Sequence, residues 1–222
     1  MESKSILTSR KMLFLLPVVL LLVTRLGIEI SVRIFDLRFS WIPAFMVYYA
    51  VIEWSFFYAK RKLAIEPVSI SFSLRPAPKW NRLVFGVIVP ALLPFGFFLL
   101  NVNAVPITFL VFIIVFALVN PYFEERFWRG LLSFLPAGNK VKIFYSALLF
   151  CGSHYFLWGA YWLANPPEKW IAAVITTFIM GILWMWFYQK DGRLEYPILS
   201  HILVDIFNLS FAVFYGIALN TI

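Results

Sequence analysis

The sequence predicts an all-α membrane protein, a bundle of about seven transmembrane helices. Hydrophobic residues make up 62% of the 222-residue chain, charged residues make up only 14%, and the mean hydropathy is +0.85. Soluble domains average roughly half apolar and a quarter charged residues. Long apolar runs also recur along the whole chain without alternating in polarity. Continuous runs of this kind favour helices over a transmembrane β-barrel.

Seven apolar runs are long enough to be candidate spans. The first has a basic start but no small-residue cleavage site, so we expect an uncleaved span rather than a signal peptide. The fourth is too long for one untilted crossing, and Pro121 is a predicted kink site because it cannot donate to the carbonyl of Ala117. The expected spans are 12–32, 41–59, 83–101, 106–134, 141–162, 170–188 and 196–217.

Lysine and arginine are concentrated before the first span and in alternate loops. The loops on the other side carry almost no net charge, apart from Arg33 and Arg38, which Glu29 and Asp36 balance in part. Because cytoplasmic loops are enriched in basic residues, this pattern predicts seven crossings and a cytoplasmic N-terminus. The basic residues concerned are Lys4, Arg10, Lys11, Lys60, Arg61, Lys62, Arg75, Lys79, Arg82, Lys140, Lys142, Lys190 and Arg193.

No internal repeat or low-complexity run divides the chain, so we expect one membrane domain over residues 1–222. The loop 60–80 is expected to lie along the membrane surface, with Trp80 at the interface. The net charge of +8 reflects these loops, and no nucleic-acid partner is expected. Cys151 is the single cysteine and cannot form an internal disulfide.

Four ionisable residues in apolar surroundings stand out on the second and fourth spans. Such groups are costly in lipid and usually face a cavity and a partner. Glu125 and Arg129 are four residues apart and can pair on one helix face, whereas Glu124 is rotated by about 100° and stays available. The alternative interpretation is an ion pair that ends a helix at the membrane edge. Glu53 is expected to be a structural partner for an arginine.

Both histidines of the chain lie inside apolar spans. For His154, the alternative to a functional role is a core histidine bonded to a neighbouring carbonyl. His201 and Asp205 are four residues apart on one face, where a local hydrogen bond between them is the alternative. Three spans thus each contribute a carboxylate or an imidazole, and the cores of helix bundles are where such groups converge to form sites.

Three short motifs occur in order on the later spans. The sequence EERFWR (124–129) fits EExxxR, FCGSH (150–154) fits FxxxH, and HILVD (201–205) fits HxxxN/D. In order and spacing they resemble the CAAX protease and bacteriocin-processing family of intramembrane glutamic-type endopeptidases, also called the type II CAAX prenyl endopeptidase-like or Abi family. The resemblance covers roughly residues 107–215. The first three spans fit only as hydrophobic helices.

The resemblance implies peptide-bond hydrolysis within the membrane by a glutamate-activated water. It implies that Glu124 is the general base and that His154 helps to hold and polarise the water. It also implies that Glu125 and Arg129 form a supporting pair. A carboxylate that is desolvated in a membrane cavity is a stronger base, which agrees with the role of Glu124.

The resemblance further implies that His201 and Asp205 stabilise the oxyanion of the tetrahedral intermediate. Asp205 departs from the pattern of many relatives, which carry asparagine at this position. An asparagine amide can donate to an oxyanion and an ionised aspartate cannot. Either Asp205 is protonated, or it orients a protonated His201 that donates instead.

Two alternative functions remain open. One is a zinc-dependent version of the same protease, with Glu124, His154 and His201 as ligands and water as the fourth, although there is no HExxH motif. The other is a non-catalytic membrane protein that holds an ion or provides binding, immunity or scaffolding. Apart from zinc, no cofactor is expected.

The substrate is defined only as a class. Eukaryotic relatives act on prenylated CAAX tails, and prokaryotic relatives act on bacteriocin precursors, signalling peptides or sorting tails. The short chain, its compact loops and the absence of a recognisable targeting segment favour a multi-pass enzyme of a prokaryotic cytoplasmic membrane, without a prenyl requirement. The expected partners are a membrane-associated peptide or protein tail and the lipid bilayer. The sequence does not determine the oligomeric state.

Overall fold

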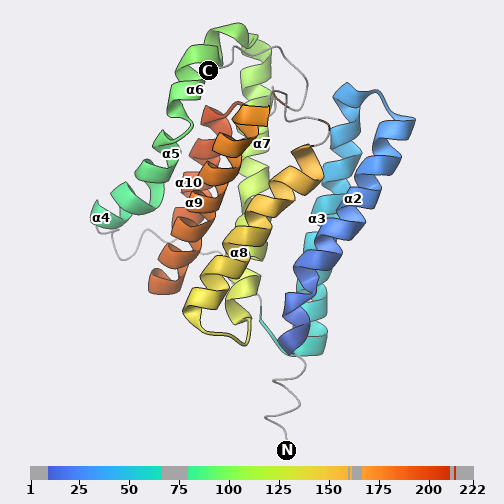
Figure 1. The fold of residues 1–222 in the computed structure, drawn as a ribbon, viewed down its shortest axis with the longest axis vertical. Helices are drawn as coiled ribbons and strands as arrows, with labels where there is room; N and C mark the ends of the chain where they lie inside the picture. Colours follow the sequence, from blue (N-terminus) through green and yellow to red (C-terminus); the bar gives the residue numbers. More distant parts are fainter. Residues whose placement is uncertain (1–9, 67–79, 160, 162–166, 211–212, 214–222) are drawn as a thin grey trace, which may run out of the picture.

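The computed structural model is a bundle of helices that run along its long axis (Figure 1). All regular elements in the described part of the chain are helical, which confirms the predicted all-α class. The described residues are 10–66, 80–159, 161, 167–210 and 213.

The first two predicted spans form a pair of neighbouring helices. A 3₁₀ turn, Lys11–Phe14, leads into α2 (Leu16–Ile34), and α3 (Leu37–Leu63) returns alongside it. Asp36 begins α3, since its carboxylate accepts a hydrogen bond of 2.9 Å from the backbone N–H of Arg38. This pair of helices brings tyrosines of α3 to the interior of the bundle.

The predicted span 83–101 is a broken helix rather than a single one. Its parts are α4 (Trp80–Leu83), a π-helical turn, α5 (Val89–Leu92) and α6 (Phe95–Asn101). The stretches on the two sides of the break meet at a bend of 41°. Pro94 lies at this break, and a proline cannot donate the backbone hydrogen bond that would continue the preceding helix.

The fourth predicted span does not end at its proline. The helix α7 runs over Ile107–Glu125 with Pro121 inside it, and a π-helical segment, Arg126–Leu131, and a 3₁₀ turn, Leu132–Phe134, extend it without a gap. A π-helix places more residues in each turn than an α-helix and is common at functional sites. The two glutamates therefore lie inside a continuous helical stretch, as the predicted site requires.

The last three helices complete the bundle. They are α8 (Asn139–Ser153), which continues as the π-helical segment His154–Gly159, then α9 (Pro167–Asp191) and α10 (Glu195–Phe207). The helices α8 and α9 pack closely, because a Cβ added to Gly181 would lie 3.0 Å from the Cα of Ala147. The last helix, α10, packs against both α9 and α7.

Three helical stretches are long and apolar enough to cross a membrane: Lys11–Ile34, Leu37–Leu63 and Ile107–Phe134. The bent pair Val84–Leu92 and Phe95–Ala104 would be a fourth. The described residues therefore support a membrane protein with three or four spans by this criterion. The seven-span topology and the cytoplasmic N-terminus stay predictions. Most of the loop 60–80 and the end of the last predicted span lie outside the described residues.

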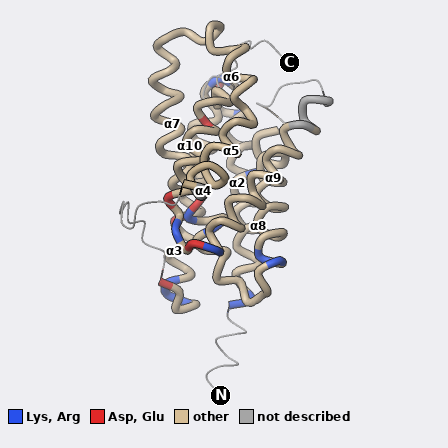
Figure 2. The backbone as a smooth tube through the Cα atoms, turned by 90° about the vertical axis from the view of Figure 1, so that its left-hand side faces the viewer, with Lys and Arg blue, Asp and Glu red and all other residues tan. Residues whose placement is uncertain are grey.

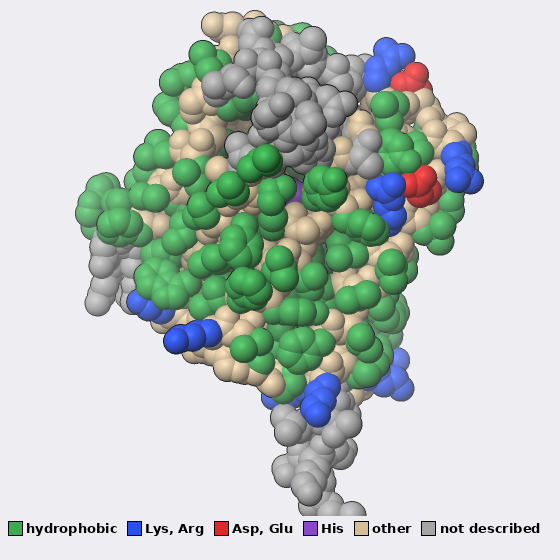
Figure 3. Space-filling model, in the orientation of Figure 1, with side chains coloured by type: hydrophobic (Ala, Val, Ile, Leu, Met, Phe, Trp, Pro, Cys, Tyr) green, Lys and Arg blue, Asp and Glu red, His purple; other side chains and the backbone are tan. Residues whose placement is uncertain are grey.

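The exterior of the bundle fits a lipid environment. Hydrophobic side chains cover most of the face in Figure 3, far more than the apolar patches usual on soluble monomers. Lysine and arginine residues gather at the lower end of the bundle, where α2 begins (Figures 2 and 3). This end is the one that the loop charges predict to be cytoplasmic.

Candidate active site

Five of the six predicted site residues meet in the interior between α7 and α10. The carboxylates of Glu124 and Glu125 and the guanidinium of Arg129 come from α7 and its π-helical extension, while His201 and Asp205 come from α10. All five are buried, and none is more than 5% exposed. Burial of this many ionisable groups requires mutual pairing, because an unpaired charge in an apolar interior is strongly unfavourable.

Glu125 and Arg129 form the ion pair that their spacing predicts, with Oε1 and Nη1 3.1 Å apart. No nitrogen of this guanidinium has an aligned hydrogen bond to the described residues. Instead, the guanidinium lies over the rings of Phe150 and Trp184, 4.2 and 5.0 Å from their centroids. Charge and cation–π contacts together hold Arg129 at the centre of the bundle.

Glu125 also holds the imidazole of His201. Its Oε1 lies 2.8 Å from Nδ1 of His201. A carboxylate only accepts, so Nδ1 carries the hydrogen and Nε2 points away from Glu125. The ring is stacked on Trp184 at a centroid distance of 4.7 Å. His201 is thus fixed by α7 and α9, and the alternative of a local bond to Asp205 is not realised, since Nε2 and Oδ1 of that pair are 3.6 Å apart.

Glu124 has one anchored oxygen and one oxygen without a partner. Its Oε1 accepts a hydrogen bond of 2.9 Å from the hydroxyl of Tyr48, which in turn accepts one of 3.1 Å from Nε1 of Trp128. Its Oε2 has no hydrogen-bond partner among the described residues and lies 3.7 Å from Nε2 of His201. The sequence predicts that the carboxylate of Glu124 stays available. In the structure only its Oε2 atom has no hydrogen-bond partner among the described residues.

Asp205 acts as an acceptor. Its Oδ2 accepts a hydrogen bond of 3.1 Å from Nδ2 of Asn120, and Oδ1 accepts one of 3.3 Å from the hydroxyl of Ser210. The hydroxyl of Tyr49 donates to Oδ1 of Asn120 over 3.1 Å. These contacts link α3, α7 and α10 through the amide of Asn120 and the carboxylate of Asp205.

His154 lies at the start of the π-helical segment that follows α8. Its Nδ1 is 2.8 Å from the carbonyl oxygen of Phe150, so Nδ1 donates and Nε2 is left as an acceptor. The ring of His154 packs on the ring of Phe150, with their centroids 4.6 Å apart. The centroid of the Phe150 ring also lies 5.9 Å from that of the His201 ring. Within the described residues no hydrogen bond joins His154 to Glu124, so their meeting through a water stays a prediction. Figure 3 shows histidine surface in a hollow among hydrophobic side chains.

All six predicted site residues lie in a segment of the chain that matches a known family. Residues 106–207 match the family model described as type II CAAX prenyl endopeptidase Rce1-like. Over this segment, which is just under half of the chain, the protein is similar to this family. No curated protein and no solved structure matches the chain. The match supports a membrane-bound protease in general terms.

The buried polar cluster consists of the five site residues and the side chains that hold them, namely Tyr48, Tyr49, Asn120 and Trp184. The segment that matches the CAAX protease family does not contain the whole cluster. Tyr48 and Tyr49 come from α3, which lies outside the matched segment and carries none of the three motifs. Asn120 lies inside the matched segment, four residues before Glu124, and this spacing places both side chains on one face of a helix. Trp184 gave no signal, because one aromatic residue in an apolar run is ordinary core.

The partner expected for Glu53 is present. Its Oε1 lies 2.7 Å from Nη1 of Arg126, and the guanidinium of Arg126 also covers the ring of Phe56 at 4.5 Å. This ion pair joins α3 to the π-helical segment after Glu125.

The proposed zinc ligands do not form a metal site in this arrangement. Among the described residues, no three histidine, cysteine, aspartate or glutamate side chains are grouped so that they could hold a metal ion. The Nδ1 atoms of His154 and His201 both face other acceptors, which leaves Nε2 as the ring nitrogen of each that could bind a metal. The zinc-dependent version therefore stays a prediction.

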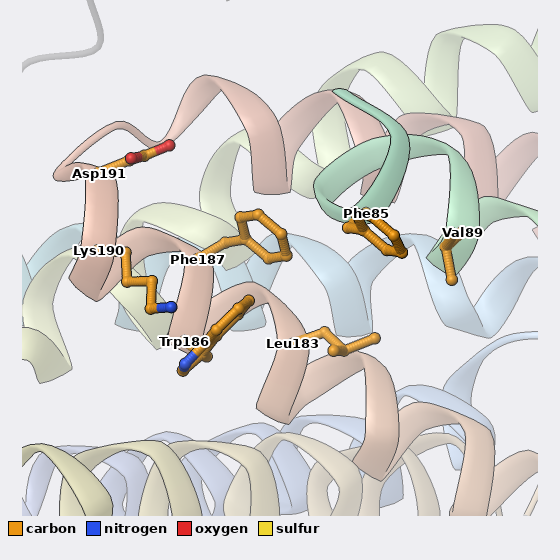
Figure 4. Close-up of a pocket in the computed structure, with 7 residues that line it drawn as sticks. All are labelled: Phe85, Val89, Leu183, Trp186, Phe187, Lys190 and Asp191. Atoms are coloured by element: carbon orange, nitrogen blue, oxygen red, sulfur yellow. The ribbon is translucent and has the colours of Figure 1, made fainter. Parts of the chain in front are cut away.

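Two apolar grooves lie outside the cluster. One, of about 570 Å³, separates Phe85 and Val89 from α9, with Lys190 at its edge over the ring of Trp186 (Figure 4). The other, of about 350 Å³, lies between α7 and α10 and is lined by Leu118, Val119, Tyr122, Phe123, Ile198 and Ile202. No residue of the cluster lines either groove. The second groove lies on the same two helices that supply the carboxylates.

Proposed function

We propose that the protein is an intramembrane endopeptidase that hydrolyses a peptide bond in a membrane-associated peptide or protein tail. The observation that carries this proposal is the carboxylate of Glu124. It is 1% exposed, its Oε1 is held by Tyr48, and its Oε2 has no hydrogen-bond partner among the described residues and faces His201. A carboxylate that is fixed by one oxygen and whose other oxygen is not engaged in a hydrogen bond suits a general base. The match to the CAAX protease family supports the same class of reaction.

The first step is the attack of water on the scissile carbonyl. Oε2 of Glu124 takes a proton from the water while the water oxygen bonds to the carbonyl carbon. The π electrons of the carbonyl move to its oxygen and form the oxyanion of a tetrahedral intermediate. Nε2 of His154, left as an acceptor by the bond from Nδ1 to Phe150, is the group that would accept a hydrogen bond from the other O–H of the water, which stays on the oxygen.

The second step is the collapse of the intermediate. The oxyanion re-forms the carbonyl, the bond from carbon to the amide nitrogen breaks, and the proton held by Glu124 passes to the leaving amine. The products are one new carboxylic acid terminus and one new amine terminus. His201, oriented by Glu125 through Nδ1, is placed to stabilise the oxyanion with Nε2 when that atom is protonated.

Several contacts hold the supporting groups in place, and catalytic geometry depends on such contacts. Glu125 is shared between Arg129 and His201, so one carboxylate neutralises a buried cation and orients the imidazole. Trp184 stacks against both of these partners. Preorganised groups of this kind need not reorganise as charge develops in the transition state.

The proposed location is a cell membrane, with seven spans and a cytoplasmic N-terminus, in a prokaryotic cytoplasmic membrane. The basic residues at one end of the bundle support this orientation. The proposed substrate is a peptide or protein tail held at the membrane, and a prenyl group is not required.

The test compares protein termini in membranes from cells that produce the wild type, Glu124→Gln or Glu53→Gln. The control removes the charge of a different carboxylate, one that is 47% exposed and pairs with Arg126 outside the cluster. We expect a set of new termini in wild-type and Glu53→Gln membranes that is lost in Glu124→Gln. If the same termini arise at the wild-type rate in Glu124→Gln cells, the protein is not a protease of this type and a non-catalytic role is favoured.

A further inference from the structure

Asn120 is a buried amide with a partner on each side. It lies on α7, is 5% exposed, and connects the hydroxyl of Tyr49 to the carboxylate of Asp205. An amide in such surroundings is costly unless it is hydrogen-bonded. Its position four residues before Glu124 puts both side chains on the same face of the helix, one turn apart.

The chemistry of its partners fixes the orientation of this amide. Asp205, when ionised, only accepts hydrogen bonds, so the atom of Asn120 that faces it is the nitrogen. The oxygen of Asn120 then faces Tyr49, whose hydroxyl donates to it. An amide nitrogen carries two hydrogens, and the bond to Asp205 uses one of them.

The groups that surround the amide are those of the proposed reaction. Oδ1 of Asp205 lies 3.6 Å from Nε2 of His201, and that nitrogen lies 3.7 Å from Oε2 of Glu124. Asn120, Asp205, His201 and Glu124 therefore form one contiguous polar group between α7 and α10. The amide N–H donors of Asn120 therefore lie beside the groups of the proposed reaction.

Most other donors near Glu124 are already committed. The hydroxyl of Tyr48 donates to Glu124 itself, and the guanidinium of Arg129 is enclosed by two aromatic rings beside Glu125. Both oxygens of Asp205 are occupied as acceptors, from Asn120 and from Ser210. Among the described side chains of this group, the donors that remain for a developing oxyanion are Nε2 of His201, when protonated, and the second amide hydrogen of Asn120.

We propose that the side-chain amide of Asn120 donates a hydrogen bond to the oxyanion of the tetrahedral intermediate, and that Asp205 orients this amide. Asp205 is then a positioning residue that acts through Asn120, and Asn120 is a catalytic residue. A neutral amide suits this task, because oxyanion donors are commonly backbone or asparagine N–H groups fixed before the reaction begins. The inference rests on the proposed protease function and adds a residue to it.

The experiment measures kcat and KM in liposomes of phosphatidylethanolamine and phosphatidylglycerol. The probe is a fluorogenic peptide that spans a terminus lost in Glu124→Gln cells. We expect Asn120→Ala to lower kcat by about 10²–10³-fold with little change in KM, as for the loss of one oxyanion donor. Asn120→Leu, which keeps much of the side-chain volume, is measured in parallel in case the smaller side chain impairs folding.

The matched control is Asn101→Ala on α6. This asparagine is also fully buried, and its amide donates to the carbonyl of Phe97 on its own helix over 2.8 Å. Its loss is expected to lower the melting temperature while kcat per folded molecule stays at the wild-type value. A purely structural role for Asn120 would give the same result, and a wild-type kcat in folded Asn120→Ala or Asn120→Leu overturns the proposal.

A charge-preserving swap tests whether the amide must lie at position 120. Asn120→Asp places two carboxylates side by side and is expected to be inactive. The double variant Asn120→Asp/Asp205→Asn restores one amide and one carboxylate but moves the amide to position 205, so we expect it to regain the melting temperature without regaining kcat. Recovery of kcat together with the melting temperature contradicts the proposal. If Glu124→Gln itself leaves cleavage unchanged, the proposed function fails; if only the Asn120 variants stay active, this inference alone fails.

Discussion

Glu125 binds His201 through a 2.8 Å contact between Oε1 and Nδ1, although Asp205 is nearer to His201 in the sequence. The same oxygen lies 3.1 Å from Nη1 of Arg129. One carboxylate thus orients the imidazole and neutralises the buried guanidinium. Its neighbour Glu124 is turned to another face of the helix, where Tyr48 holds it. Two adjacent glutamates therefore have separate tasks.

Removal of the charge on Glu125 should destabilise the protein. In Glu125→Gln the guanidinium of Arg129 would remain buried without its ion-pair partner, and loss of one partner of a buried pair costs about 3–5 kcal/mol. The double variant Glu125→Gln/Arg129→Met should be less destabilised, because no charge is left unpaired. Thermal unfolding of the purified protein in lipid bicelles measures both. Equal stability of Glu125→Gln and the wild type would show that the pair is not essential to the fold.

Loss of the Tyr48 hydroxyl should affect both stability and activity. Tyr48→Phe leaves Nε1 of Trp128 and Oε1 of Glu124 without their partner, at a cost of about 1–3 kcal/mol. The carboxylate of Glu124 would also lose its fixed orientation, so kcat should fall. Tyr58→Phe on the same helix is the control for a tyrosine outside the cluster. If the two variants have the same kcat, Tyr48 does not position Glu124.

His154→Asn separates a structural role of this histidine from a catalytic one. Asparagine can still donate to the carbonyl of Phe150 in place of Nδ1, but it lacks the acceptor that Nε2 provides. We expect a folded protein with a cleavage rate lowered by about 10²–10⁴-fold, as is typical for loss of a group that assists proton transfer. A near-normal rate, with an unchanged melting temperature, would mean that His154 serves only to bond its own helix.

Chelation should leave the cleavage rate unchanged. The described residues contain no group of three side chains arranged to hold a metal ion, and the proposed steps use only carboxylate and imidazole groups. The measurement is the cleavage rate after dialysis against a strong chelator, with and without added zinc. Loss of activity on chelation and its return with zinc would instead support the zinc-dependent version.

The sequence is informative where contacts are local. Continuous apolar runs predict helices, and the spacing of Glu125 and Arg129 predicts their ion pair. The need of Glu53 for an arginine is also predictable, because a charge in an apolar span needs a counter-charge. The family resemblance adds the expectation that α7 and α10 approach each other. These contacts follow from helix geometry, the cost of buried charge and a shared motif.

The remaining contacts depend on how distant helices pack. Whether His201 binds Asp205 or Glu125 is decided by the position of α10 relative to α7, which residue spacing alone does not define. Tyr48 reaches Glu124 from a helix 76 residues earlier in the chain. The 41° bend at Pro94 is similar: a proline indicates a break, but packing sets its angle.

The rate of peptide cleavage by Glu124→Gln is the sharpest test of whether Glu124 is the general base. The reconstituted wild type, Glu124→Gln and Glu53→Gln are compared in single-turnover reactions with the same membrane-bound peptide. We expect Glu53→Gln to cleave at close to the wild-type rate and Glu124→Gln to fall to the background of protein-free liposomes, because glutamine cannot accept the proton of water. Cleavage by Glu124→Gln at the wild-type rate would show that Glu124 is not the general base.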